Sequence, residues 1–556
     1  MTYQVPSRDD AAPVPSRDDA GIPSGRVLAG IPSRDDPTIR RASAVIGGPL
    51  GRYAAIGRSF WWTPVRVLLA VAMVTLLLGY AEKLPCADGN WVATKQYTHA
   101  CYSDVIPLWS AEGLDKGEVP YRDHAVEYPV LTGGFMYLSA ELTRAWHAVA
   151  ADGWLPGHNE GIMFGVITCA LLALCGLLAV YATAGAAGPR RFWDAAIFAA
   201  SPLLIFHAFS NWDLLAMAFA SGALWAWARN RPVLAGLLIG LGTAAKLYPV
   251  LLLLPLALLG YRSRQWRPVV SAAVAALVSW LVVNLPIALT WTSGWKEFYT
   301  FSEQRPAEAS TFWAMLKYFY PSTFGSPVNS AWTPPGIAVA IVLLIALGAV
   351  SWLALSVPVR PRLAQLAFLT VLAFLLTTKV WSPQYSLWLV PLVALARPRW
   401  RLALIWQAAE IAVWVATLLW LLAGSDPNKA MTYEGLTWIL LIRDGILLVL
   451  AGLVIYEMYH PEADPVRIPE DPDPGAGLFA AAGIDRVLSR RSLVPDRLLS
   501  VASDRLAPRR SAGLGPSLGA ARPRGRPGPA VLSRVRLRPV RSRPPAVAGE
   551  AGPTLP

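Results

Sequence analysis

Long apolar runs, separated by short polar turns, constrain this chain more than any other feature. Several of them reach the roughly 20 residues that a transmembrane helix needs. With 54% apolar and 15% charged residues, the chain is too apolar for a soluble protein of its length. We therefore predict an all-α, polytopic membrane protein with about 12 transmembrane helices, near 64–81, 161–184, 192–209, 212–229, 232–246, 247–260, 268–290, 336–357, 362–378, 383–396, 402–422 and 436–457.

Basic residues recur in every second loop between these runs. Such a distribution marks cytoplasmic loops, and it accounts for the net charge of +13 without a nucleic-acid partner. It predicts a multi-pass protein of the cell membrane with both termini in the cytoplasm. The clusters are Arg190–Arg191, Arg229 and Arg231, Arg262, Arg264 and Arg267, Arg360 and Arg362, and Arg397, Arg399 and Arg401.

The two ends of the chain differ from its middle. Residues 1–60 hold no apolar run and repeat the phrase VPSRDDA, while residues 461–556 are rich in Arg, Pro, Gly and Ala. Segments of such composition cannot bury a core, so we expect two disordered cytoplasmic tails. The transmembrane domain is then 61–460.

The segment 82–160 becomes a long first extracytoplasmic loop under this topology. Its part 130–150 is expected to be an interfacial or re-entrant helix, because another crossing there would invert every later loop. The loop also carries several carboxylates, for which ordinary solvated charges are the alternative. Asp104 differs because apolar residues surround it, so that it can be held at the membrane surface and act as a base.

Other ionisable residues interrupt apolar runs at the predicted outer ends of helices. They are Asp213, Lys246 and Lys379. A charge at that depth is costly unless it is paired, reaches the interface or lines a cavity. A structural pair or a snorkelling lysine remains the alternative to a site.

Five phrases in this order resemble glycosyltransferase family 87, over about residues 60–457. They are Asp104 with the aromatic stretch after it, GEVPYRDHAVEYPVLTGGF, NWDLLA, AGLLIGLGTAAKLYPVLLLLPL and KVWSPQYSLWLVPL. The resemblance implies a GT-C-like architecture and a hexosyltransferase, an α-mannosyltransferase. It implies inverting transfer from a polyprenyl-phosphate sugar to a glycan or glycolipid acceptor on the extracytoplasmic face, without a cofactor.

The resemblance also implies site residues. The loop aspartate of the family falls on Asp104, and the phrases add Asp123 and Glu127 as further catalytic candidates. We expect substrate to contact Tyr121, His207, Asp213, Lys246, Lys379 and Gln384.

The chemistry fits these residue types without the resemblance. A polyprenyl phosphate leaves as a stabilised anion, so the reaction needs one carboxylate base and a nearby cation. A glycoside hydrolase would need two facing carboxylates. The first outer loop has no Asp-x-Asp pair, so no metal is expected. The glycines of 236–246 lack the ending of a phosphate loop and predict close helix packing.

Two of the four cysteines, Cys86 and Cys101, lie in the predicted outer loop, where disulfides persist. We expect them to form a disulfide, with two free thiols as the alternative. Cys169 and Cys175 lie six residues apart in one predicted helix and face different sides, so they cannot pair with each other.

Two other functions fit a chain of this kind. One is a transporter or a flippase of lipid-linked sugars, and the other is a silent scaffold that presents the long loop. Transporters usually show two similar halves, and we find no internal repeat. The concentration of charged residues toward one face favours an enzyme.

Overall fold

The computed structural model describes residues 62–87, 91, 94–324, 332–468 and 473–480, with the single positions 42, 45, 482 and 485–487. These residues belong to one unit, 1–489. Within them the regular structure is helical and no strand forms, which confirms the all-α class. The N-terminal tail predicted over 1–60 lies outside the described residues, apart from positions 42 and 45.

Six described helices are long and apolar enough to cross a membrane, judged by length and composition. The chain is therefore a membrane-embedded protein. These helices are α2 (Pro64–Ala87), α6 (Glu160–Ala187), α12 (Trp266–Thr290), α16 (Gly336–Ser356), α19 (Trp400–Leu421) and α20 (Tyr433–Tyr459).

The other six predicted spans are helical but short. A helix of 14 residues such as α10 is about 21 Å long, less than the roughly 30 Å of a hydrocarbon core. The structure thus gives six candidate spans where the sequence predicts 12. The short segments are α9 (Asp213–Ala228), α10 (Pro232–Ala245), η4 (Tyr248–Leu252) with α11 (Leu253–Ser263), α17 (Leu363–Thr377), η5 (Pro383–Trp388) with α18 (Leu389–Ala396), and η3 (Phe192–Ala195) with α7 (Ala196–Ala199) and α8 (Pro202–His207).

Prolines explain several of these breaks. Pro202, Pro249 and Pro383 each stand in the first turn of a new short helix, where a missing N–H costs nothing. The breaks matter for the site, because polar residues gather at them.

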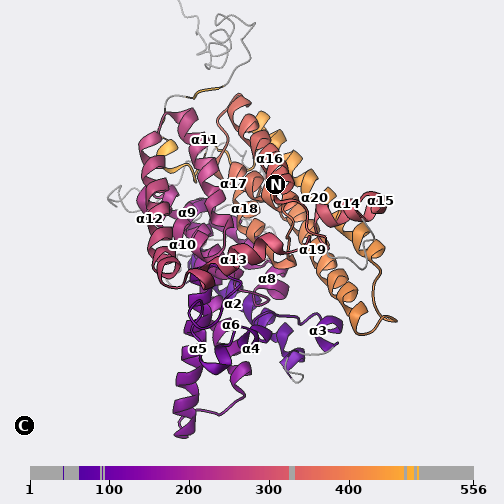
Figure 1. The fold of residues 1–556 in the computed structure, drawn as a ribbon. Coiled ribbons are helices and arrows are strands. Elements are labelled where there is room, and N and C mark those ends of the chain that lie inside the picture. The colour runs from indigo at the N-terminus through magenta and orange to yellow at the C-terminus, as the bar shows by residue number, and fades with distance from the viewer. Residues whose placement is uncertain are drawn as a thin grey trace, which may run out of the picture. The chain divides into compact units, whose positions relative to one another are not determined.

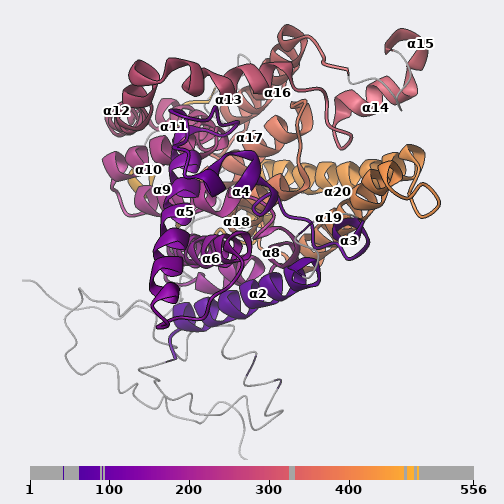
Figure 2. The same ribbon diagram turned by 60° about the horizontal axis from the view of Figure 1, so that its bottom comes forward.

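Five helices pack in a row, in the order α2, α6, α9, α10 and α12, and Figures 1 and 2 both show α10 beside α12. Glycines allow the closest approach. A Cβ atom at Gly236 or Gly240 would collide with the backbone of α12 at Ala272 or Ala276. The glycine-rich phrase before Lys246 is therefore a helix-packing surface.

The predicted outer loop contains a helix of its own, α5 (Val130–Ala151), which packs against α6 and α10. It does not qualify as a candidate span. The Thr132 hydroxyl donates to the Ala245 carbonyl at 2.7 Å and so joins the start of α5 to the end of α10. The shorter helices between the apolar ones are α3 (Lys95–Thr98), α4 (Pro107–Ala111), η2 (Leu114–Lys116), α13 (Thr292–Gln304), α14 (Phe312–Phe319) and α15 (Pro321–Phe324).

Residues after α20 pack against the basic turns that the sequence places in the cytoplasm. Arg362 pairs with Asp464 at 2.7 Å, and Arg262 pairs with Asp485 at 2.6 Å. Both arginine side chains are buried, so these ion pairs fix the segment in place. Residues 461–468 and 473–480, which fall in the predicted disordered tail, thus pack against the helices, and most of 461–556 lies outside the described residues.

Topology can be tested with reporters at alternate turns. Reporters fused after Gly188, Arg264 and Arg399 should report a cytoplasmic position, and those after Asp115 and Arg305 an external one, because basic turns stay inside. Paired phosphatase and fluorescent-protein fusions measure this. A cytoplasmic signal at Asp115 would contradict the orientation, because it would move the loop of Asp104 to the other face.

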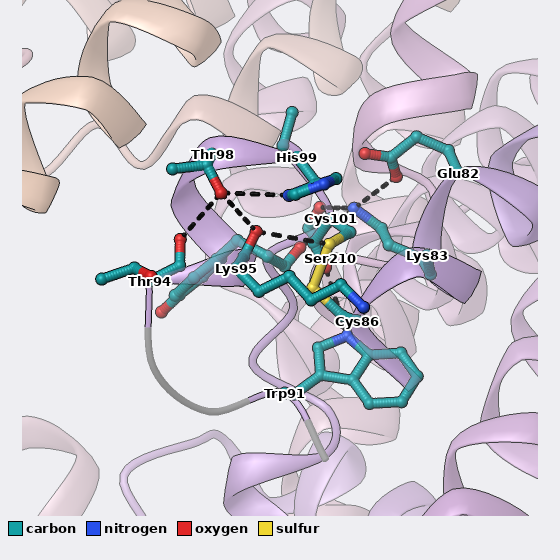
Figure 3. Close-up of a disulfide and its surroundings, with 12 residues drawn as sticks. Glu82, Lys83, Cys86, Trp91, Thr94, Lys95, Thr98, His99, Cys101 and Ser210 are labelled. Atoms are coloured by element: carbon teal, nitrogen blue, oxygen red, sulfur yellow. Dashed lines mark hydrogen bonds and ion pairs between the residues drawn. A yellow bond between two sulfur atoms is a disulfide. The ribbon is translucent and has the colours of Figure 1, made fainter. Parts of the chain in front are cut away.

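A disulfide joins Cys86 at the end of α2 to Cys101, with the two Cα atoms 5.8 Å apart (Figure 3). It is the pairing expected from the sequence. Both residues are buried, and the indole of Trp91 donates to the Cys101 carbonyl at 3.2 Å. Cys169 and Cys175 are free. The bridge holds the segment leading to Asp104 against α2.

Thiol labelling of the denatured, unreduced protein should modify two cysteines, Cys169 and Cys175. Reduction before labelling should raise the number to four, which controls for access. The bridge should stabilise the fold by about 3 kcal/mol through its effect on the unfolded chain. Four reactive thiols without reduction would show that the bridge does not form.

Candidate active site

A cavity of about 560 Å³ lies where several turns predicted to be extracytoplasmic meet. Its volume is within the usual range for a small-molecule site. It is lined by Tyr102, Asp104, Glu127, Tyr128, Pro129, Asn211, Lys246, Leu247, Tyr248, Phe298, Phe301, Ser302, Arg305, Val339, Phe374, Thr378, Lys379, Val380, Ser382, Gln384, Tyr385 and Trp388.

Asp104 is held in the cavity wall by its backbone and by both carboxylate oxygens. Its N–H donates to the Ser210 carbonyl at 2.9 Å. The Tyr102 hydroxyl donates to Oδ1 at 2.7 Å, and the Asn211 amide donates to Oδ2 at 2.8 Å. The neighbouring side chains of Val105 and Trp109 are buried, as the sequence pattern indicates. The carboxylate is therefore oriented while half-buried at a cavity surface.

Asn211 connects Asp104 to a buried ion pair. Lys246 contacts both oxygens of Asp213, at 2.9 and 3.0 Å, and the amide oxygen of Asn211 at 3.2 Å. The indole of Trp388 donates to Asp213 at 2.8 Å. Asp213 is fully buried and neutralises Lys246, so this lysine is anchored rather than free to move.

A second cation, Arg305, follows α13 and lines the same cavity. It forms an ion pair with Glu308, and Glu308 also accepts a hydrogen bond from the Ser382 hydroxyl at 2.8 Å. Burial raises the pKa of Glu308, and the charge of Arg305 opposes that rise. A guanidinium has five N–H donors, so Arg305 keeps donors for an anion in the cavity.

Lys379 belongs to the turn after α17 and ties that turn to the end of α13. Its ammonium donates to the Glu303 carbonyl at 2.6 Å, while its own carbonyl accepts from the Glu308 N–H at 2.9 Å. Partial burial lowers the pKa of Lys379. Two cations, Arg305 and Lys379, thus line the cavity from adjoining turns.

Aromatic rings form a flat stretch of the wall. Trp388 is stacked between Tyr248 and Tyr385, with ring centroids 4.2 Å apart on each side. The Lys246 ammonium lies 4.8 Å from the centre of the Tyr385 ring. Rings fixed in this way suit contacts with the apolar face of a sugar.

Glu127 is the second carboxylate of the cavity, and burial raises its pKa. Burial and the nearby charge of Glu127 also raise the pKa of Glu112 to about 7. Both glutamates therefore bind a proton more readily than exposed glutamates do.

The structure brings together five of the site residues predicted from the sequence. Asp104, Glu127, Lys246, Lys379 and Gln384 line the cavity, and the predicted Asp213 supports it through Lys246. These residues come from segments far apart in the chain.

Three predicted site residues lie outside the cavity lining. Asp123 is exposed and paired with Arg122, whose hydrogen bonds lower its pKa to about 2. The Tyr121 hydroxyl donates to the Tyr128 and Pro129 carbonyls, so it shapes the chain before α5.

His207 is the third, buried on α8 with its ring edge-on to Trp414, the two ring centres 5.0 Å apart. Neither it nor the two residues above contacts the cavity in this geometry.

Sequence reasoning missed Asn211, Arg305 and the tyrosines Tyr102 and Tyr128. Asn211 was visible in the NWD phrase, directly before Asp213. Arg305 had no local signal, because it sits in a long polar loop among other charges. Among the described residues, no three His, Cys, Asp or Glu side chains come together as metal ligands.

Residues 145–383 match the model of glycosyltransferase family 87. The matched region belongs to this family. Over these residues the match confirms the resemblance drawn from the sequence phrases, and it includes the cavity residues from Asn211 to Phe374 together with Lys379 and Ser382. Asp104 and Glu127 precede the matched region. No curated protein matches the chain. The family 87 match over residues 145–383 and the several apolar helices together indicate a membrane glycosyltransferase.

Proposed function

We propose that this glycosyltransferase transfers a hexose, specifically mannose, from a polyprenyl phosphate to a glycan or glycolipid acceptor. We place the reaction on the extracytoplasmic face of the cell membrane. The observation that carries the proposal is that an oriented carboxylate, Asp104, and a cation with spare donors, Arg305, line one cavity.

The two groups match the needs of an inverting transfer. The acceptor hydroxyl attacks the anomeric carbon and gives its proton to Asp104. The bond from that carbon to the phosphate oxygen breaks, and the polyprenyl phosphate leaves with the electron pair. Arg305, with Lys379, stabilises the charge that develops on the phosphate. No external co-reactant is required.

The walls of the cavity support a lipid-linked donor. Phe298, Phe301, Val339 and Phe374 form an apolar side, contributed by α13, α16 and α17. The other lining residues include the polar groups around Asp104. A prenyl chain against the apolar side would leave its phosphate near the cations and its sugar near the carboxylate.

A transfer assay with purified protein in liposomes tests the function. Polyprenyl-phosphate mannose with a radioactive sugar is offered with glycolipids extracted from the source membrane, and labelled product is separated from donor. Covalent transfer supports the proposal, and parallel donors carrying glucose or galactose test the sugar. Movement of the donor across the bilayer without covalent transfer would instead support the flippase.

A further inference from the structure

Lys83 is a buried charge that the chemistry proposed above does not use. It lies near the end of α2, where its side chain is 3% exposed, and it does not line the active-site cavity. Glu82 pairs with its ammonium at 2.9 Å. A buried ammonium is expensive, so its other contacts must offset the loss of water.

The ammonium of Lys83 joins two distant segments of the chain. It donates to the Tyr102 carbonyl at 2.9 Å and to the Phe206 carbonyl at 3.0 Å. A further hydrogen bond goes to the Ser210 hydroxyl at 3.3 Å (Figure 3). With the Glu82 carboxylate, four oxygens thus surround the three N–H donors of the ammonium.

These segments are the ones that place the carboxylate base. The N–H of Asp104 donates to the Ser210 carbonyl, and the Ser103 hydroxyl donates to the Phe209 carbonyl at 2.7 Å. Asn211, which follows Ser210, donates a hydrogen bond to the Asp104 carboxylate. Lys83 thus contacts both segments and does not itself line the cavity.

The disulfide reinforces the same contact. Cys86 lies three residues after Lys83 and therefore on the same side of α2. Its partner Cys101 directly precedes Tyr102. The last turns of α2 therefore hold the Asp104 segment by a covalent bond and by a charged hydrogen bond.

We propose that Lys83 is a positioning residue of the active site, which fixes the Tyr102–Asp104 segment against Ser210 and Asn211. The role of the site rests on the proposed function, whereas the contact itself does not. A displaced base lowers the rate of the chemical step and leaves binding of the donor by distant groups largely intact.

The Lys83→Met variant keeps the length of the side chain and removes its donors. We expect kcat to fall by about 30-fold or more, with the KM for the donor changed less than about threefold. Lys83→Arg, which keeps charge and donors, should recover part of kcat. Glu82→Gln is the matched control: it removes the partner charge but leaves the three contacts of Lys83, and activity should stay near that of the natural protein.

Hydrogen exchange gives a readout that does not depend on activity. In Lys83→Met, peptides covering 102–108 should exchange at least about tenfold faster, because the Asp104 N–H loses its fixed acceptor, while α9 stays unchanged. Ser210→Ala removes one acceptor of the Lys83 ammonium and should speed exchange in the same peptides by a smaller factor. This variant replaces Lys83→Met in the test if Lys83→Met does not fold.

The outcomes separate the positioning role of Lys83 from the proposed transferase function. Unchanged exchange in both variants, or an unchanged kcat in an active enzyme, overturns the positioning role. Equal losses in Glu82→Gln and Lys83→Met also overturn it, because they assign the effect to the buried ion pair. A natural protein without transfer activity overturns the proposed function, and the exchange result then still decides the contact.

Discussion

The Asp104→Asn variant is expected to lose sugar transfer by about a hundredfold or more, because the amide cannot accept the proton of the attacking hydroxyl. The side chain keeps its size, and one oxygen remains to accept from Tyr102 or Asn211. Initial rates at saturating donor measure the effect, with thermal unfolding as the check on folding.

Asp115→Asn is the matched control for this experiment. Asp115 lies in the same loop but is exposed and outside the cavity lining, so its variant should transfer at the normal rate. Glu127→Gln tests the other carboxylate of the cavity. Near-normal transfer by Asp104→Asn together with loss in Glu127→Gln would assign the base to Glu127.

The Arg305→Met variant is expected to lower kcat by about a hundredfold, since it removes the donors to which the proposed mechanism assigns the leaving phosphate. It also leaves Glu308 without its cation in a buried position. The Glu308 carboxyl already has a raised pKa and should become protonated when Arg305 is lost. The double variant Arg305→Met with Glu308→Gln removes the unpaired carboxylate, so any remaining loss of kcat reflects the chemistry and not the folding. The double variant should fold normally and stay inactive.

Lys379→Met provides a comparison within the same cavity. The ammonium of Lys379 is committed to the Glu303 carbonyl, so we expect its loss to cost less than about tenfold. Arg305→Lys should be intermediate, because it keeps the charge but loses the fork of donors. A normal kcat and donor KM in Arg305→Met would place the phosphate elsewhere, with Lys246 as the next candidate.

Lys246 and His207 show that the local sequence does not predict which side chains reach the cavity. Both Lys246 and His207 are expected from the sequence to contact substrate. The structure places Lys246 on Asp213 in the cavity wall, while His207 packs against Trp414 behind it. The direction of a side chain at a helix end depends on neighbours that the local sequence does not contain.

The loop carboxylates show the same limit. Asp123 and Glu127 lie four residues apart in one phrase, yet Asp123 is exposed beside Arg122 and Glu127 lines the cavity. The backbone at Tyr121 is left-handed, with φ of 70°, and turns the chain after Asp104 and before the two later carboxylates. A turn of this kind, made by a residue other than glycine, has no clear signal in the sequence.

The sequence by itself determined the helical class, the membrane environment and the resemblance to family 87. Each of these depends on local composition or on short phrases, such as the apolar run of α6 or the NWDLLA of α9. The pairing of Cys86 with Cys101 also followed, because these are the two cysteines of the predicted outer loop, while the other two lie in one predicted helix.

Only the tertiary structure decided which of these residues share a site. Asp104 and Asn211 are 107 residues apart, and Lys246 and Arg305 come from still other turns. The short helices broken at Pro202, Pro249 and Pro383 bring these turns together, and long-range hydrogen bonds then fix their side chains. Contacts between distant segments depend on how whole helices pack, which no local pattern contains.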